Sequence, residues 1–389
     1  MQKGIKVSMM RNSIFLTGAT GNIGANLMLR ILDEDPDCRL FLLVRADSTV
    51  EAAHRVSDAV RKVAPEADID AIRRRTTVLC GDVSQRNLGL TDSKLANLSD
   101  EITHIIHSAG ATQFNLSLGQ ALLTNYTGTR NVMTLARMAH KKGRLQRVAH
   151  VSTAYICGTL EGALYEDELP NVVRFLNNYE WSKWETERYL RNLMGILPLT
   201  IFRPSIVIGD SRTGRLIKFN VLYPPLKFIT HGHIKALRCS PDTPLDVVPV
   251  DYVSDAIHYI FFNSQSCVGK TFHLVAGKDR AATVGEIVDH AIQFFTERCP
   301  AEAIAGIRYL PAIHRDLCSP DPDDNGSKTN RAMMMFEDYL HWHRHFDDAN
   351  TKEALRGSGI EVPELASYYD TILSHYFESG SLKVRRFAA

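Results

Sequence analysis

Two side chains in the segment NYEWSKW, residues 178–184, could take part in proton transfer. Tyr179 stands four residues before Lys183, and residues four apart lie on the same face of a helix. A phenol beside an ammonium group can donate a proton during hydride transfer, because the positive charge lowers the phenol pKa from about 10. The same spacing also fits plain packing, with the lysine stem along the tyrosine ring. The pair alone leaves both interpretations open.

Further polar groups could complete a site around this pair. Ser152 and Thr153 follow the apolar run 147–151, which reads as a buried strand, and Thr153 precedes Tyr179 by 26 residues. That length is enough for a loop and a turn of helix. Asn125 lies inside the helical pattern 120–140, between two expected strands.

A glycine-rich turn follows the first apolar strand, in TGATGNIG at residues 17–24. Gly18 permits a tight turn, Gly21 lets a pyrophosphate approach the backbone, and Gly24 lets the next helix pack closely on the sheet. Helix N-termini also offer free N–H groups to phosphate. A plain glycine-rich turn is the alternative, but the place between strand and helix favours a dinucleotide site, which includes Thr20, Asn22 and Ile23.

The second strand ends in LFLLVRAD, where an NAD-binding chain usually carries an acid for the ribose hydroxyl. Arg45 takes that place, and a guanidinium suits a 2′-phosphate, which favours NADPH. Asp47, two residues on, keeps NADH open. Arg55 is expected as a second phosphate partner, although a solvated helix face explains it equally well.

Other strand ends offer residues to the same ligand, because ligands of open α/β sheets bind at the carboxyl ends of strands. Asp82 could bind the adenine amino group, and Val83 could lie against the ring. Small residues after the fourth strand let the cofactor pass, and a proline–serine pair after the sixth lies beside the nicotinamide or merely stiffens the strand exit. These residues are Ser108, Ala109, Pro204 and Ser205.

The elements that must position these residues alternate between short apolar runs and helical patterns. Strands are expected at 14–17, 40–44, 77–80, 104–107, 147–151, 199–202 and 271–276, and helices at 24–32, 120–140, 181–193 and 284–298. This alternation predicts an α/β fold, a doubly wound parallel sheet of Rossmann type with a smaller, mostly helical C-terminal lobe. We expect residues 10–210 with about 245–278 to bind NADP, and 211–244 with 279–389 to bind substrate. Residues 211–249, rich in proline, are expected to be irregular.

Bulk composition narrows the function. The 389 residues carry a net charge of +1, which gives no electrostatic argument for nucleic acid, and no apolar run is long enough to span a membrane. Seven scattered cysteines without a C-x-x-C pair favour a reducing compartment, so we expect a cytoplasmic protein without signal peptide. His341, His343 and His345 alternate, but without an acidic partner they are expected at the surface, and no metal site is predicted.

The motifs together resemble the extended short-chain dehydrogenase/reductase family, and within it the fatty acyl-CoA reductase and thioester reductase branch. The stretches that carry the resemblance are TGATGNIG, LLVRADSTVEAAHR, VLCGDVSQRNLGL, NYTGTRNVMTLA, HVSTAYICG, NYEWSKWETERYL, FRPSIVIGDSRTGR and LDVVPVDYVSDAI. The resemblance implies that Tyr179 donates a proton, that Lys183 lowers the pKa of Tyr179 and holds the nicotinamide ribose, and that Thr153 binds the developing oxyanion. Asn125 would position a water behind the lysine.

The same resemblance implies an NADPH-dependent reduction of an acyl thioester, bound to coenzyme A or a carrier protein, to the aldehyde, and it leaves a second reduction to the alcohol open. A ketone or aldehyde reductase, a nucleotide-sugar epimerase or dehydratase, and a non-enzymatic NADP-binding regulator stay as alternatives. The protein would be a monomer or homodimer. Aromatic and aliphatic residues that could line an acyl channel or belong to the core are Phe114, Phe219, Leu222, Tyr223, Phe228 and Ile229, and His231 and His233 could reach substrate.

Overall fold

A parallel sheet forms the centre of the protein. The computed structural model describes residues 11–219, 221–230, 234, 236–298, 306–310 and 338–380. The seven strands run in the order β12-β7-β5-β4-β1-β2-β3, and every pair is parallel. They are β1 (Ser13–Thr17), β2 (Arg39–Val44), β3 (Thr76–Cys80), β4 (His104–His107), β5 (Arg147–Val151), β7 (Leu199–Pro204) and β12 (Thr271–Leu274). The predicted fold class, a doubly wound Rossmann-type sheet, is confirmed.

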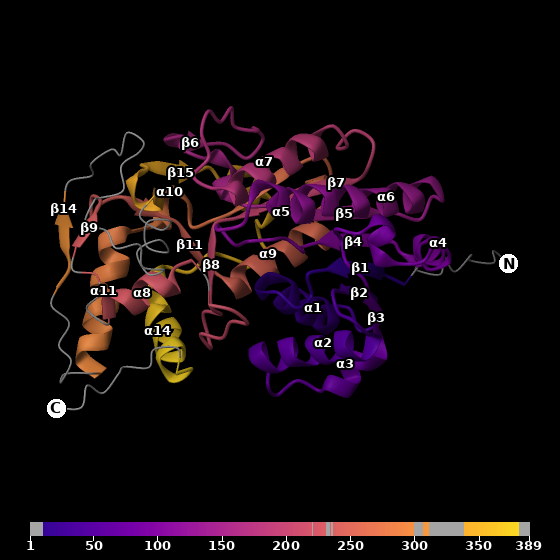
Figure 1. The fold of residues 1–389 in the computed structure, drawn as a ribbon, viewed down its shortest axis with the longest axis horizontal. Coiled ribbons are helices and arrows are strands. Elements are labelled where there is room, and N and C mark those ends of the chain that lie inside the picture. Colours follow the sequence, from indigo (N-terminus) through magenta and orange to yellow (C-terminus); the bar gives the residue numbers. More distant parts are fainter. Residues whose placement is uncertain are drawn as a thin grey trace.

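Helices cover both faces of this sheet (Figure 1). They are α1 (Asn22–Glu34), α2 (Thr49–Val63), α3 (Ile69–Arg75), α4 (Asp92–Glu101), α5 (Leu118–Leu122), α6 (Gly128–Lys141), α7 (Asn178–Arg191) and α9 (Val250–Asn263). Neighbouring residues of a strand point to opposite faces of the sheet, and each face has its own apolar cluster: Leu16 packs in one and Phe15 in the other. Because both faces are buried, the strands read as continuous apolar runs rather than alternating ones.

The second lobe combines short strand pairs with helices. Its strands are β6 (Gly162–Leu164), β8 (Ile206–Ile208), β9 (Ala236–Arg238), β10 (Pro244–Leu245), β11 (Val247–Pro249), β13 (Ala282–Thr283), β14 (Arg308–Leu310) and β15 (Arg344–Phe346). Its helices are α8 (Tyr223–Thr230), α10 (Gly277–Arg280), α11 (Val284–Arg298), α13 (Ala349–Ala354) and α14 (Tyr369–Glu378). Helices α8, α11 and α14 gather at one end of the molecule, and α4 lies at the opposite end (Figure 1).

The structure of the second lobe shows that one expectation from the sequence was wrong. Residues 211–249 are not irregular throughout, because they contain α8 and three short strands. Pro224 and Pro225 stand in the first turn of α8, where a missing N–H leaves no intrahelical bond unmade. The prolines therefore mark a helix start. The division of the chain into cofactor and substrate parts at 210 and 245–278 stays a prediction.

The lobe is held on the sheet by a buried polar cluster. Arg203 of β7 donates to both carboxylate oxygens of Glu187 in α7, at 3.0 and 2.7 Å, and both side chains are buried. Glu166 accepts hydrogen bonds from the backbone of His273 in β12 and from Thr351 in α13. The Glu166 contacts fix α13 against the edge strand β12, and the Arg203–Glu187 pair joins α7 to the neighbouring strand β7.

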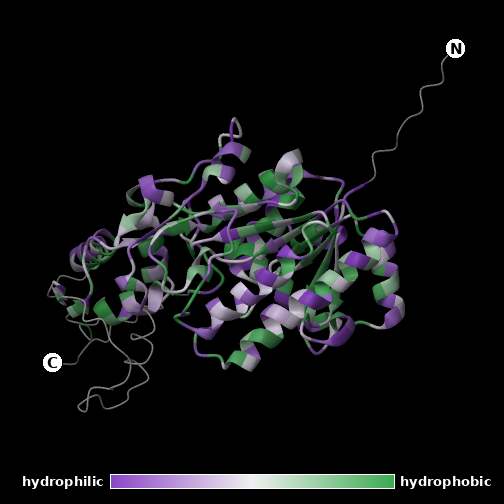
Figure 2. Ribbon diagram, turned by 90° about the horizontal axis from the view of Figure 1, so that it is seen from above, coloured by the Kyte–Doolittle hydropathy of each residue, from purple (hydrophilic) through white to green (hydrophobic). Residues whose placement is uncertain are grey.

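Hydrophobic residues gather on the central strands and on the helix faces turned toward them (Figure 2). Within the described part of the chain, no helix has the length and apolar character needed to cross a membrane.

Candidate active site

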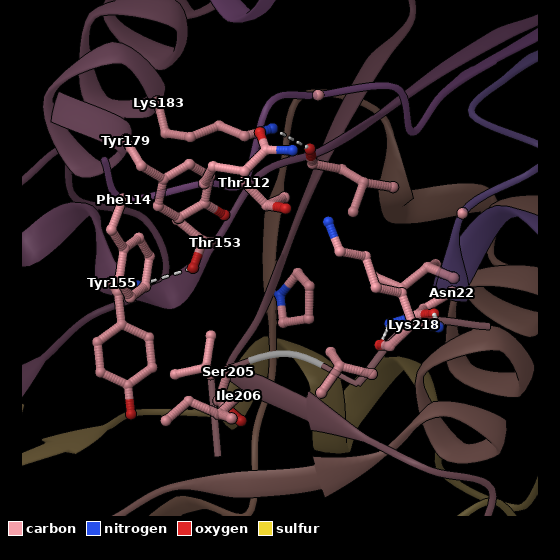
Figure 3. Close-up of a pocket in the computed structure, with 18 of the residues that line it drawn as sticks. Asn22, Thr112, Phe114, Thr153, Tyr155, Tyr179, Lys183, Ser205, Ile206 and Lys218 are labelled. Carbon is pink, nitrogen blue, oxygen red and sulfur yellow. Dashed lines mark hydrogen bonds between the residues drawn. The ribbon is translucent and has the colours of Figure 1, made fainter. Parts of the chain in front are cut away.

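A cavity of about 920 Å³ opens at the carboxyl ends of the central strands, between the sheet and the second lobe (Figure 3). Its wall contains the ends of β1, β4, β5 and β7, the start of α7 and residues of the lobe. Among the residues predicted from sequence, it collects Thr20, Gly21, Asn22, Ile23, Gly24, Ser108, Thr153, Tyr179, Lys183, Pro204 and Ser205.

Helix α7 brings Tyr179 and Lys183 to the cavity on one face. The helix starts at Asn178, because the side chain of Asn177 caps it by accepting from the backbone N–H of Glu180 at 3.0 Å. Removal from water raises the pKa of Tyr179 to about 12, and a hydrogen bond with Thr153 partly opposes this. Burial lowers the pKa of Lys183 to about 8, against the opposing charge of Glu187. The phenol therefore stays protonated, and the lysine pKa moves closer to neutral pH.

The lysine is held from behind by the sheet. Its Nζ donates to the backbone carbonyl of Val151, at the end of β5, at 3.0 Å. One direction of the ammonium group is therefore fixed, and Figure 3 shows the Lys183 side chain running past Tyr179 toward that strand. This bond holds the ammonium group at the carboxyl end of β5.

Thr153 leaves β5 beside the phenol. Its hydroxyl accepts from the backbone N–H of Tyr155 at 3.2 Å, which starts the short 3₁₀ turn η3 (Ala154–Cys157). With that lone pair used, its own proton can point to the phenol or to a ligand oxygen in the cavity. Ser152, the competing hydroxyl, is buried, and its Oγ has no hydrogen-bond partner among the described residues.

Asn125 lies behind these residues and not on the cavity wall. It sits in the π turn η2 (Leu123–Thr127) between α5 and α6, a local widening of a helix that is frequent at functional sites. Its amide accepts from the backbone N–H of Ala111 at 2.8 Å and donates to Ser182 at 2.7 Å. A side chain at Gly110 would lie 3.2 Å from both Asn125 Oδ1 and Lys183 Nζ, so the amide oxygen and the ammonium flank this glycine.

The glycine turn fits a dinucleotide. Gly18 has φ +80°, and a Cβ there would lie 2.7 Å from the backbone N of Ala109. A Cβ at Gly24 would lie 2.1 Å from the carbonyl oxygen of Gly18. Only glycine permits this close approach of α1 to β1 and β4. Helix α1 then starts with no side-chain cap and no acid in its first turn, which leaves its N-terminus open to phosphate.

The predicted residues beyond the cavity wall lie along the same sheet edge. Arg45 follows β2 and is exposed, and the Arg55 guanidinium of α2 donates to the Arg45 backbone carbonyl. Asp82 follows β3, but its carboxylate accepts from the backbone and the hydroxyl of Ser84. Val83 is buried, with its side chain against Gly128. The two arginines thus stand together, whereas Asp82 and Val83 contact residues of their own surroundings.

Sequence reasoning missed several residues on the cavity wall. Tyr155 follows Thr153 on the same strand exit, and that position could have indicated it. Lys218 is tied to the glycine turn, because its backbone N–H donates to Asn22 Oδ1 at 2.9 Å while the Asn22 amide donates to its carbonyl. Its side chain points into the cavity (Figure 3). Tyr339, from the C-terminal part, also lines the wall, and no local pattern marks it.

The residues predicted to line an acyl channel fall into two groups, one on the cavity wall and one in the core of the second lobe. Phe114 lines the cavity, whereas Leu222, Tyr223 and Ile229 are buried in the lobe core. Phe219 and Phe228 pack against that core. His231 and His233 lie outside the described residues. Of the alternating histidines, His341 belongs to the 3₁₀ turn η6 (Asp338–His341), while His343 and His345 lie just before β15 and within it; no cluster of three metal-binding side chains is found among the described residues.

Comparison with known proteins places these features in a family. One protein of the linear gramicidin synthase of Brevibacillus parabrevis is 28% identical over 95% of this chain and 7% of its own length. The fatty acyl-CoA reductase wat of Drosophila melanogaster is 26% identical over 63% of this chain and 53% of its own length. The chain thus spans about half the length of the fly reductase and a small part of the length of the gramicidin synthase protein.

The solved terminal R domain of the myxalamid PKS-NRPS biosynthetic pathway has a similar structure. It superimposes with a TM-score of 0.80 and 26% identity, over 97% of this chain and 93% of the domain. A family model described as "Male sterility protein", that of a nicotinamide-dinucleotide-binding domain, matches residues 16–257, which include the glycine turn, Thr153, Tyr179 and Lys183. By this match the chain belongs to the male sterility protein family of NAD-binding domains.

Proposed function

We propose that this protein reduces an acyl thioester to the aldehyde, with NADPH as the reductant. One observation carries the proposal: Thr153, Tyr179 and Lys183 meet on one cavity whose wall also includes the glycine turn and an apolar surface. A carbonyl group bound there would contact a proton donor, a hydrogen-bond donor and a fixed positive charge together. Similarity to the R domain and to the fly acyl-CoA reductase supports a thioester as the substrate.

The chain's own residues manage the proton and the negative charge. NADPH, when bound, supplies the hydride that reduces the carbonyl carbon. Tyr179 gives its proton to the carbonyl oxygen, Thr153 donates a hydrogen bond to the same oxygen, and Lys183 stabilises the phenolate left behind. The product is a hemithioacetal, which loses the thiol and yields the aldehyde. One acyl thioester, one NADPH and one proton therefore give one aldehyde, one free thiol and one NADP⁺.

Preference for NADPH rests on Arg45 and Arg55. Both side chains are exposed, and the Arg55 guanidinium donates to the Arg45 backbone carbonyl, which keeps the two residues next to each other at the end of β2. Two cations suit a 2′-phosphate, which carries nearly two negative charges. Asp47, the residue that would favour NADH, is also exposed, and its backbone N–H donates to Glu51.

The substrate side of the cavity matches a thioester with an apolar acyl group. Phe114, Tyr155 and Tyr339 form an aromatic surface next to Tyr179, and Thr112 and Gln113 provide polar groups at the exposed rim. The acyl group would lie on the aromatic surface, and the amides of a pantetheine arm would lie at the rim. Coenzyme A and a carrier protein both present that arm. The aldehyde fits the same site, so a second reduction to the alcohol uses the same residues.

The test compares substrates and a matched pair of variants. Loss of NADPH absorbance is followed with acyl-CoA thioesters of graded length, a carrier-bound thioester, aldehydes, ketones and a UDP-sugar. Tyr179→Phe is expected to lower kcat by about 10²–10⁴-fold, the usual contribution of a general acid. Tyr126→Phe, in the neighbouring π turn and outside the cavity wall, is the control and should keep full activity. Turnover of aldehydes or ketones alone would overturn the thioester assignment.

A further inference from the structure

Tyr339 reaches the site from the far end of the chain. It lies in η6 (Asp338–His341), 160 residues after Tyr179, and is only 4% exposed while it lines the cavity. Nothing in the proposed proton transfer uses it. Its hydroxyl nevertheless makes two hydrogen bonds, and both partners belong to the N-cap and first turn of the helix that carries Tyr179.

Three side chains form a closed set of hydrogen bonds at this point. The Tyr339 hydroxyl donates to Glu180 Oε1 at 2.5 Å and accepts from the Asn177 amide at 2.8 Å. The Asn177 side chain in turn accepts from the backbone N–H of Glu180 at 3.0 Å, and Glu180 Oε2 accepts from the backbone N–H of Leu176. The start of α7 is therefore bonded to the C-terminal segment through one phenol.

Ring contacts make a second connection to Tyr179. Tyr339 stacks on Phe114 with ring centres 5.4 Å apart and planes 16° from parallel. Phe114 in turn packs against the ring of Tyr179, with centres 5.9 Å apart. Figure 3 shows Phe114 beside Tyr179 on the side of the cavity where Tyr155 lies. The rotamer of Tyr179 is thus limited by a ring whose own place depends on Tyr339.

Glu180 is a carboxylic acid without solvent contact. Its side chain is 0% exposed, and burial raises its pKa to about 7, while the Tyr339 hydrogen bond and the Leu176 N–H oppose this rise. Its charge raises the pKa of Tyr179 in turn. The titratable and charged groups that face Glu180 are Tyr339 and Asp338 of η6, Arg344 of β15, Tyr155 and Cys157 of η3, and Tyr179 itself.

We propose that Tyr339 is a positioning residue of the reductive site, which acts on Tyr179 through the carboxylate of Glu180 and the ring of Phe114. The proposal rests on the proposed function in so far as Tyr179 is the proton donor. In this arrangement the C-terminal segment, through Tyr339, completes the active site. The Tyr339 hydroxyl keeps Glu180 ionised over a wider pH range and fixes the first turn of α7, so the phenol of Tyr179 keeps both its place and its proton.

The test uses Tyr339→Phe, which keeps the ring and its stacking on Phe114 but removes the hydroxyl. We expect kcat to fall on the order of tenfold, while the KM for NADPH is unchanged, because the glycine turn is not touched. Tyr369→Phe is the matched control: it removes the hydroxyl of a fully buried tyrosine that has no hydrogen-bond partner among the described residues. It should leave kcat unchanged.

The pH profile separates positioning from packing. Glu180→Gln removes the charge, so the pKa of Tyr179 falls and the alkaline limb of kcat/KM moves to lower pH. Burial raises the pKa of Glu180 only to about 7, so at the alkaline limb Glu180 is ionised with or without the Tyr339 hydrogen bond. Tyr339→Phe should instead move the inflection of kcat that follows ionisation of Glu180 to higher pH, because the carboxyl then holds its proton to higher pH. In the Glu180→Gln background, Tyr339→Phe should give no further shift. An additive shift, or lost activity without any shift, would overturn the proposal. If Tyr339→Phe does not fold, the alkaline limb of kcat/KM in Glu180→Gln is the test, and an unmoved limb would overturn the proposal.

An error in the substrate assignment would not mask the result. The profiles are recorded with whichever carbonyl class the protein reduces. The ring of Tyr179 is also titrated without substrate by NMR of isotope-labelled tyrosine in the NADP⁺ complex, where its signal is assigned by its absence in Tyr179→Phe. The expected pKa shift of this signal in Glu180→Gln, together with no thioester reduction, would reject the proposed substrate and retain the inference. No change of the signal in either variant would reject the inference.

Discussion

Replacement of Arg45 and Arg55 tests how the protein distinguishes NADPH from NADH. Both guanidinium groups are exposed at the end of β2, and Arg55 donates to the Arg45 carbonyl. A hydrogen bond to a charged group contributes about 1.5–3 kcal/mol, and solvent exposure places these contacts at the low end. About 1.5 kcal/mol corresponds to roughly a tenfold change in affinity. Arg45→Ala should therefore raise the KM for NADPH about tenfold and leave the KM for NADH unchanged.

The double variant refines this prediction. Neighbouring charges that share one phosphate do not act independently, so the loss in Arg45→Ala/Arg55→Ala should be less than the product of the two single losses. Initial rates with each cofactor give the ratio of kcat/KM for NADPH to that for NADH. Arg61→Ala is the control, because this exposed arginine of the same helix pairs with Asp58. Equal losses with both cofactors, or none with NADPH, would refute the reasoning and direct attention to Asp47.

Three further substitutions test the framework around the site. Gly24→Ala should abolish dinucleotide binding, measured by fluorescence titration, because its methyl would lie 2.1 Å from a backbone oxygen; Gly119→Ala, with no atom within 4 Å, should bind normally. Arg203→Met should lower the free energy of unfolding by about 3–5 kcal/mol in urea titrations, because it leaves Glu187 buried and unpaired. Burial raises the pKa of Glu166 to about 7, so its neutral form is favoured on folding. The unfolding free energy of wild type minus that of Glu166→Gln should therefore be largest below about pH 4.5 and fall as the pH rises through about 7; no fall would contradict this.

The sheet was predictable because its strands, apart from the half-buried edge strand β3, are buried on both faces. The runs expected at 104–107 and 147–151 coincide with β4 and β5, and the other strands of the sheet differ by one or two residues at their ends. A strand inside an α/β sheet has no solvent-facing side, so an uninterrupted apolar run with polar flanks is sufficient evidence for it. The lobe lacks that signal, and the prolines that open α8 suggested irregular chain instead.

The site was predictable to the same extent as its local motifs. Thr153, Tyr179, Lys183 and the glycine turn each follow a strand or begin a helix, and parallel strands deliver their carboxyl ends to one edge. The structure brings them to one cavity, although their catalytic roles stay predictions. Tyr339 and Lys218 could not be found in this way. Their places depend on how the second lobe folds across the sheet edge, through contacts such as Tyr339 with Glu180 and Lys218 with Asn22, and no spacing in the sequence encodes such contacts.

Release of a thiol distinguishes reduction of a thioester at Tyr179 from reduction of any other carbonyl group. NADPH oxidation and free thiol are followed together in one reaction with an acyl-CoA or carrier-bound thioester, and the product is identified by mass spectrometry. We predict one thiol for each NADPH when the aldehyde accumulates, or one thiol for every two NADPH when the alcohol forms, with both signals lost in Tyr179→Phe. Oxidation of NADPH by aldehydes or ketones without thiol release from any thioester would contradict the proposed function.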